Sequence, residues 1–331
     1  MVMGGMVVRV TDGLSLAAAV PLLLGCEPVR SLVAVAVAGG QVMVCGRVDL
    51  PADPVLAPDP VWVPALGTQV VANGIDGLVL VFCTDHPRRW RRAAKRTARA
   101  LGRLLPDPDR VQILWRSGTA AGSYDEPATS ATLAQLSGRD EVQALAFQAT
   151  TRGRRPMTRQ ALAEQLEPAC TGTGVPDHQL DDAMTQMRRC SPTELRQAVA
   201  ALYRELLTAA DRGAALPQDQ TADLLAALTV SPQARDQATL LAIRDAAGDR
   251  AASVVAGLTR LTGQAPDRVA PAAGWVLAVA ACRAGDGVLA NLAIDRVLRV
   301  DPAYPAAHLL MQFMFSGLRP EELDMLLTEP S

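Results

Sequence analysis

The hydrophobic pattern of the chain changes near residue 151, and this change constrains the fold more than any other feature of the sequence. Before it, short apolar runs alternate with amphipathic stretches, an order that predicts strands and helices in an α/β structure. After it, alanine- and leucine-rich stretches with helix-start signals follow one another, and no run predicts a strand. We therefore expect an α/β domain over residues 1–151 and a helical domain over residues 152–331.

Apolar runs in the first domain predict the strands of a mixed sheet. Residues 32–37 and 41–48 are rich in β-branched side chains and flank two glycines, which predicts a β-hairpin. Residues 78–83 are apolar throughout, the pattern of a strand that is buried on both faces. A helical stretch at 88–105 and a further strand at 111–115 complete a βαβ unit, whose two strands are parallel.

Helix signals account for the whole of the second domain. Ser191-Pro192 and Ser231-Pro232 each place a capping serine before a proline in the first helical turn. We expect helices near 158–167, 177–189, 192–212, 218–229, 232–246 and 249–262. In the final segment, 270–317, three more helices are expected at 275–284, 288–300 and 305–316. The pattern of this segment resembles one and a half units of a helical-hairpin repeat such as the tetratricopeptide motif.

Charge, cysteine usage and apolar run length bound the compartment and the partners. The formal net charge is -2, so the chain as a whole is not attracted to nucleic acid or to anionic lipid. Six cysteines without a C-x-x-C pair and three isolated histidines predict free thiols and no metal site. No apolar run approaches the ~20 residues that cross a bilayer, and we expect a cytoplasmic protein without a membrane span.

One apolar stretch, Leu14 to Leu24, has two interpretations. The sequence Leu23-Leu24-Gly25-Cys26 resembles a bacterial lipoprotein cleavage site. However, Asp12 precedes the stretch and Pro21 interrupts it, so we favour a short buried helix that ends at Gly25.

The ends of the predicted strands supply one set of candidate ligand-binding residues. They are Arg47, Asp49, Thr84, Asp85, Ser117, Gly118 and Thr119. Ligands bind beyond the carboxyl ends of parallel strands. The pair Asp85-His86, near a glycine- and hydroxyl-rich loop, can bind a phosphate or support acid–base chemistry. The simpler alternative is that Asp85 caps the following helix and that the glycines at 118 and 122 make a surface turn.

A second candidate is a strongly basic helix, which contains the only lysine of the chain. Its cations are Arg88, Arg89, Arg91, Arg92, Lys95, Arg96, Arg99 and Arg103. On a helix they fan across one face, opposite an apolar stripe that begins at Trp90. A nucleic acid, an acidic protein partner or the acidic helical half of this chain would each match this charge. The alternative is a solvated helix in an arginine-rich proteome, and no helix-turn-helix or zinc-finger pattern supports base reading.

Three motifs together resemble a known family. Residues 18–33 contain Pro21, Gly25, Pro28 and Ser31; a second motif is Arg47-Val-Asp49-Leu-Pro51. The third runs from Gly285-Asp286-Gly287 to Asp301-Pro302-x-Tyr304. In this order they are similar to the actinobacterial domain-of-unknown-function family 4192. The resemblance implies a bacterial cytoplasmic protein with an α/β front half and a helical back half. It also implies a cysteine-rich loop at residues 116–123, where this chain has no cysteine.

These observations lead to a functional expectation with two alternatives. The G-x-S-x-G, P-loop and H-E-x-x-H patterns are missing, so we expect no catalytic residue, no metal and no cofactor. The favoured function is that of a non-catalytic scaffold or binding protein with a protein partner. The first alternative is a phosphate- or nucleotide-binding protein or an enzyme that uses the strand ends. The second is a nucleic-acid-associated protein that acts through residues 88–103.

Overall fold

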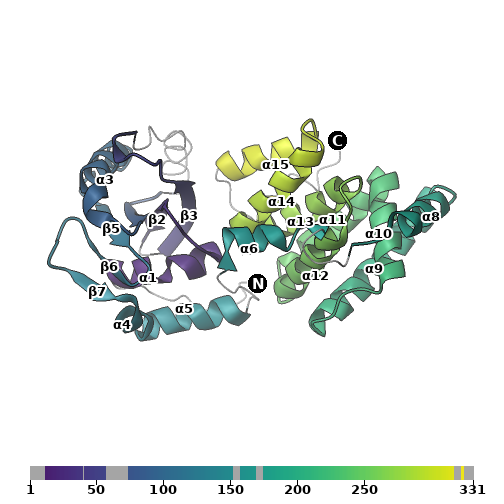
Figure 1. The fold of residues 1–331 in the computed structure, drawn as a ribbon, viewed down its shortest axis with the longest axis horizontal. Helices are drawn as coiled ribbons and strands as arrows, with labels where there is room; N and C mark the ends of the chain where they lie inside the picture. Colours follow the sequence, from purple (N-terminus) through teal and green to yellow (C-terminus); the bar gives the residue numbers. More distant parts are fainter. Residues whose placement is uncertain are drawn as a thin grey trace. The chain divides into compact units, whose positions relative to one another are not determined.

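The computed structural model describes residues 12–39, 41–56, 74–151, 157–168, 174–316 and 322–323. The chain divides into two compact units (Figure 1). Residues 1–156 with 315–317 form the first unit, and residues 157–314 with 318–331 form the second. The first unit contains a mixed sheet with helices and the second is mostly helical, so the predicted order of an α/β half and a helical half is confirmed.

The first unit is built around a six-stranded sheet with the strand order β3-β2-β4-β5-β6-β7. Its strands are β2 (Ser31–Ala38), β3 (Gln41–Asp49), β4 (Gly77–Cys83), β5 (Val111–Arg116), β6 (Ala120–Ser123) and β7 (Ser130–Thr132). Strands β4 and β5 are parallel, and the other neighbouring strands are antiparallel. Both the predicted hairpin and the predicted βαβ unit are therefore present.

The described helices of the first unit are α1 (Gly13–Leu24), α3 (Pro87–Gly102), α4 (Leu133–Ser137) and α5 (Asp140–Thr151), with a 3-10 turn η1 (Pro54–Leu56) and a two-residue strand β1 (Cys26–Glu27). These helices pack against the sheet, except α5, which packs against α1 and α4 (Figure 1). The buried face of α3 joins Leu32, Leu80 and Phe82 in one apolar cluster, while α1 packs against β5 and β6. The predicted short helix is confirmed, and Gly25 ends it with a φ of +75°, a conformation that favours glycine.

The structure corrects several boundaries in the first unit. The expected loop from residue 116 to residue 123 is largely a hairpin, because β5 extends to Arg116 and β6 begins at Ala120. Helix α3 ends at Gly102, three residues before the predicted end. Strand β7 and helices α4 and α5 were not predicted at all. Part of the proline-rich segment 51–64 lies outside the described residues.

A glycine sets how closely two of these strands pack. Gly122 of β6 pairs with Trp115 of β5, and a Cβ atom at Gly122 would lie 2.5 Å from the indole ring. We expect Gly122→Ala to lower the free energy of unfolding by about 1–3 kcal/mol, because the indole must move within a packed layer. Urea unfolding of the variant and of the wild-type protein measures this loss of stability. Gly118→Ala is the control, since its Cβ would meet no atom within 4 Å; equal unfolding midpoints for the two variants would contradict the prediction.

The second unit is a helical array whose core is rich in alanine and leucine. Its helices are α6 (Arg159–Glu164), α8 (Asp177–Met187), α9 (Pro192–Asp211), α10 (Gln218–Val230), α11 (Pro232–Ala246), α12 (Ala251–Gln264), α13 (Ala270–Arg283), α14 (Gly287–Val300) and α15 (Pro305–Ser316). The predicted helices are confirmed, except that α13 starts at Ala270 rather than at Trp275. The expectation of no strand in this half is wrong for one short strand, β8 (Met157–Thr158).

Helices α13 and α14 form a tight hairpin at the position that the sequence indicated. The turn contains Gly285, which has a φ of +74°, and Asp286 caps α14 by accepting a hydrogen bond from the Leu289 amide. A Cβ atom on Gly274 would lie 2.8 Å from Val297, so the two helices approach closely at this point. The third motif therefore contributes to helix packing.

Candidate functional site

A row of four side chains crosses the sheet at one end, with one residue from each of four adjacent strands. The strand registers pair Asp49 with Ser31 and Ser31 with Cys83. They also pair Cys83 with Arg116. Because directly paired residues project from the same face of a sheet, these four side chains are neighbours. The row, which we name the strand-end row, lies at the carboxyl ends of the parallel strands β4 and β5, where α/β sheets bind ligands.

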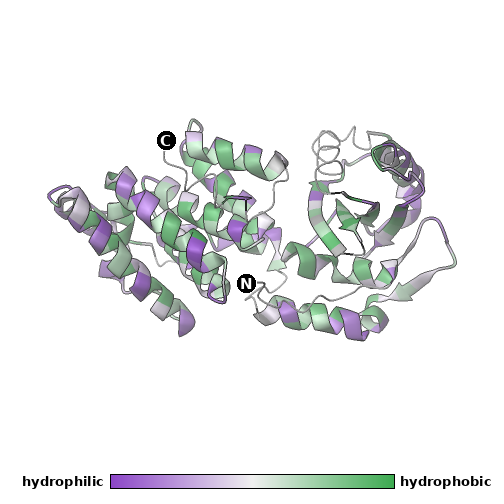
Figure 2. Ribbon diagram, turned by 180° about the vertical axis from the view of Figure 1, so that it is seen from behind, coloured by the Kyte–Doolittle hydropathy of each residue, from purple (hydrophilic) through white to green (hydrophobic). Residues whose placement is uncertain are grey.

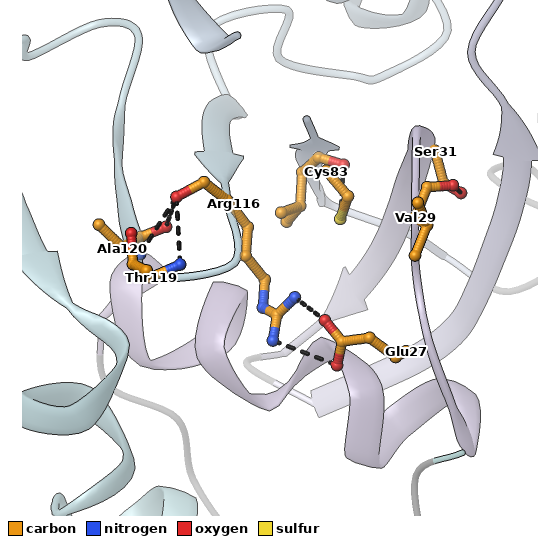
Figure 3. Close-up of polar contacts among 9 residues, drawn as sticks. Glu27, Val29, Ser31, Cys83, Arg116, Thr119 and Ala120 are labelled. Atoms are coloured by element: carbon orange, nitrogen blue, oxygen red, sulfur yellow. Dashed lines mark hydrogen bonds and ion pairs between the residues drawn. The ribbon is translucent and has the colours of Figure 1, made fainter. Parts of the chain in front are cut away.

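Arg116 carries a positive charge into the protein interior. Its side chain is only 9% exposed, and both of its terminal nitrogens contact the carboxylate of Glu27 (Figure 3). The Arg116 Nε atom is buried and has no hydrogen-bond partner. An unmet donor in a buried position costs about 1–3 kcal/mol. Arg116 is therefore incompletely satisfied by the described protein atoms.

A second arginine, Arg47, lies beside the other end of the strand-end row, where it contacts Ser31 and Asp49. Arg47 donates from Nε to the Ser31 hydroxyl at 2.8 Å, and one of its terminal nitrogens forms an ion pair with Asp49. The Ser31 hydroxyl in turn donates to the Val29 carbonyl at 2.8 Å. Ser31 belongs to the first sequence motif, and Arg47 and Asp49 belong to the second. The fold thus brings two of the three motifs into contact.

Two cysteines near the row, Cys45 and Cys83, have thiols whose protonation is controlled by burial. Burial raises the pKa of Cys83 to about 12; the guanidinium groups of Arg116 and Arg47 oppose this shift, and Glu27 and Cys26 add to it. Burial, followed by the nearby Cys83 and Cys26, also raises the pKa of Cys45 to about 12. At neutral pH these two groups are neutral thiols, which are poor nucleophiles and poor metal ligands.

The remaining predicted ligand residues lie beside the row. The Thr84 amide donates to the Arg116 carbonyl at 2.8 Å and so extends the strand pairing. Asp85 is exposed, and the interpretation that it caps α3 is wrong, because His86 occupies the N-cap position and no side chain caps the helix.

The three residues of the predicted loop, Ser117, Gly118 and Thr119, form the β5–β6 turn. The Ser117 hydroxyl accepts hydrogen bonds from the amides of Thr119 and Ala120, at 3.4 and 3.1 Å. This turn is therefore held by its own hydrogen bonds.

Sequence reasoning missed four members of this site: Glu27, Ser31, Cys83 and Arg116. Ser31 entered the sequence analysis only as part of a family motif. Glu27 and Arg116 are 89 positions apart, so no local spacing connects them. One signal was present, because Arg116 directly follows the apolar run 111–115. A charged residue at the end of a buried strand is a candidate for a partnered, buried charge.

The outer face of α3 is the second cationic feature of this unit. Its apolar stripe is buried in the core, as predicted. Lys95 is half-buried. The seven arginines are exposed: Arg88, Arg89, Arg91, Arg92, Arg96, Arg99 and Arg103. In Figure 2 the hydrophilic colour marks this outer side of α3. None of the eight cations forms an ion pair with a residue that the structure describes; Arg96 donates to the Pro54 carbonyl at 3.1 Å.

An open hollow of about 1240 Å³ lies near the amino-terminal ends of β4 and β5, at the other end of the sheet from the strand-end row. Lys95 and Arg99 of α3 contribute to its lining. Asp76 and Arg110 also line it and form an ion pair at 3.2 Å. The hollow carries charges of both signs, so it has no single electrostatic preference.

These features define a protein with an α/β unit that carries two clusters of arginine, followed by a helical unit. A family model described as "domain of unknown function (DUF4192)" matches residues 14–321, and the chain belongs to this family. No curated protein and no solved structure matches the chain. Within the described ranges, no helix has both the length and the apolar character that crossing a bilayer requires. In those same ranges no group of His, Cys, Asp and Glu side chains is arranged to hold a metal ion.

Proposed function

We propose that this protein is a non-catalytic binding protein and that the outer face of α3 binds an acidic protein surface. The observation that carries the proposal is the row of exposed arginines on a single 16-residue helix without ion-pair partners among the described residues. Arg88, Arg92 and Arg96 are spaced four residues apart, and like charges at this spacing destabilise a helix. An anionic partner relieves that repulsion.

The surroundings of α3 favour discrete carboxylates over a phosphate backbone. Asp85 precedes the helix, Asp107 and Asp109 follow it, and all three are exposed, so they would repel a nucleic acid that runs along the helix. The aromatic residue of the helix, Trp90, is buried and cannot stack on a base. An acidic protein surface can place its separate carboxylates against the arginines of α3, away from Asp85, Asp107 and Asp109.

The chemistry of the strand-end row supports binding rather than catalysis. The Cys83 thiol remains protonated at neutral pH, and the carboxylates of Glu27 and Asp49 are held in ion pairs with arginines. Cys45, Cys83, Cys190 and Cys282 are free thiols, which supports a reducing, cytoplasmic location. The near-complete use of arginine over lysine supports an origin in a GC-rich genome such as those of actinobacteria.

The test compares two variants with the same change in charge. Arg88, Arg91 and Arg92 on α3 are replaced together by glutamate, and Arg188, Arg189 and Arg196, all exposed in the helical unit, are replaced in the control. A labelled polyglutamate peptide is the probe, and fluorescence anisotropy reports its binding. We expect the α3 variant to lose at least tenfold in affinity and the control to bind like the wild-type protein.

Nucleic acid is tested in parallel, with labelled 20-nucleotide duplex and single strands over a range of salt concentrations. If both variants lose the same affinity for polyglutamate, α3 is not the binding surface. Tighter binding of a nucleic acid than of polyglutamate, with a steep salt dependence, would overturn the acidic-protein proposal in favour of the nucleic-acid alternative.

A further inference from the structure

We propose that the strand-end row is a binding site for a small oxyanion, either a phosphate or a carboxylate group of a ligand. Arg116 is the recognition group, and the carboxylate of Glu27, which contacts its two terminal nitrogens, competes with the ligand for this guanidinium group. This site is separate from the outer face of α3, so the proposal does not rest on the proposed function.

The unmet donor of Arg116 is the first observation. A guanidinium group presents five N–H donors in a planar fork, and an oxyanion is commonly held by two of them at once. Glu27 contacts the two terminal nitrogens and leaves Nε buried without an acceptor. An oxyanion that binds along the Nε side of the fork satisfies the donor that Glu27 leaves unmet.

The exposure of the two acids is the second observation. Arg116 of the row and Arg47 beside it are mostly buried, whereas Glu27 is 38% exposed and Asp49 is 71% exposed. Each buried guanidinium group is therefore paired with a carboxylate that can move into water at little cost. The arrangement provides fixed positive charge and replaceable negative charge, as a site for a soluble anion requires.

The backbone around the row adds two further features. Arg30, between β1 and β2, has a φ of +44°, a region that non-glycine residues rarely adopt and that is enriched at binding sites. The Arg30 carbonyl accepts the Leu50 amide at 2.8 Å, which ties this turn to the end of β3. Helix α3 starts at Pro87, four residues after the end of β4, and no side chain caps it. Its amino terminus therefore adds positive potential at the same end of the sheet.

The experiment measures thermal unfolding at constant ionic strength, set with chloride, while inorganic phosphate or acetate is titrated. We expect at least one anion to raise the midpoint of the wild-type protein, because a ligand that binds the folded state stabilises it. Glu27→Gln removes the competing negative charge next to Arg116, and its half-maximal response should occur at an anion concentration at least tenfold lower. Arg116→Met should abolish the response.

Further variants provide a test if Arg116→Met does not fold, and they distinguish this site from α3. If Arg116→Met does not fold, Arg47→Met provides the second test and should weaken the response at least fivefold. The Arg88, Arg91 and Arg92 triple variant should respond like the wild-type protein, which separates this site from α3. A phosphate response alone indicates a phosphorylated ligand, and an acetate response alone indicates a carboxylate. A wild-type protein that responds to neither anion, or an undiminished response in Arg116→Met, overturns the proposal.

Discussion

Replacing Arg296 by methionine is expected to destabilise the helical unit by about 2–4 kcal/mol. The Arg296 side chain is 1% exposed and donates to the carbonyls of Thr262 and Ala265, at the carboxyl end of α12. Burial lowers the pKa of this guanidinium, and the carboxylates of Glu167 and Asp267 oppose the shift. Methionine fills similar space but leaves these carbonyls without their charged donor, and a hydrogen bond to a charged group contributes about 1.5–3 kcal/mol.

A neighbouring arginine of α14 provides the matched control. Arg299 forms an ion pair with Glu167 at 2.6 Å, but its side chain is 60% exposed. Arg299→Met should therefore cost less than about 1 kcal/mol. Urea unfolding compares the two variants, and hydrogen exchange of peptides from residues 251–300 locates the loss in the helical unit. Equal midpoints for the two variants would show that the Arg296 contacts add no net stability.

The three family motifs thus have different physical roles. The third motif contains Arg296 and the α13–α14 turn, and both stabilise helix packing. The first two motifs meet at the strand-end row through the hydrogen bond between Arg47 and Ser31. Substitutions in the third motif should act on stability, whereas substitutions in the first two should act on ligand binding.

Local sequence patterns were sufficient for the elements that bury a continuous apolar surface. The run 78–83 and the stripe on α3 each contain enough apolar side chains to define one strand and one buried helix face. The capping serine at residue 191 likewise marks the start of α9 within one residue. Propensity and burial agree in these segments, and the prediction succeeds for that reason.

Other elements exist only because of pairing with distant parts of the chain. Strand β6 consists of Ala-Ala-Gly-Ser, which has no strand propensity, and it forms because Gly122 fits against Trp115. The ion pair of Arg116 with Glu27 joins residues 89 positions apart. Buried polar contacts of this kind depend on register and topology, which a local pattern does not specify.

Alkaline pH should destabilise both units, because each contains a buried thiol. Burial raises the pKa of Cys83 from 9.0 to about 12 and that of Cys282 from 9.0 to about 11, with Arg283 opposing the shift at Cys282. Around Cys83, Arg116 and Arg47 oppose the shift and Glu27 and Cys26 add to it. Between pH 9 and these raised values the unfolded chain loses protons that the folded chain retains, so stability falls as pH rises.

At pH 10 each thiol should remove about 1.4 kcal/mol from the free energy of unfolding of its own unit, compared with pH 8. Urea unfolding at pH 7, 8, 9 and 10 in the presence of a reductant measures the slope, and hydrogen exchange separates the units. The α/β unit also contains Cys45, whose pKa burial raises to about 12, so Cys83→Ala should reduce the pH dependence of this unit and the Cys45→Ala, Cys83→Ala double variant should reduce it further. Cys282→Ala should reduce the pH dependence of the helical unit alone. A wild-type stability that is constant from pH 8 to pH 10 would contradict the prediction, since it requires thiols that titrate equally in the folded and unfolded chain.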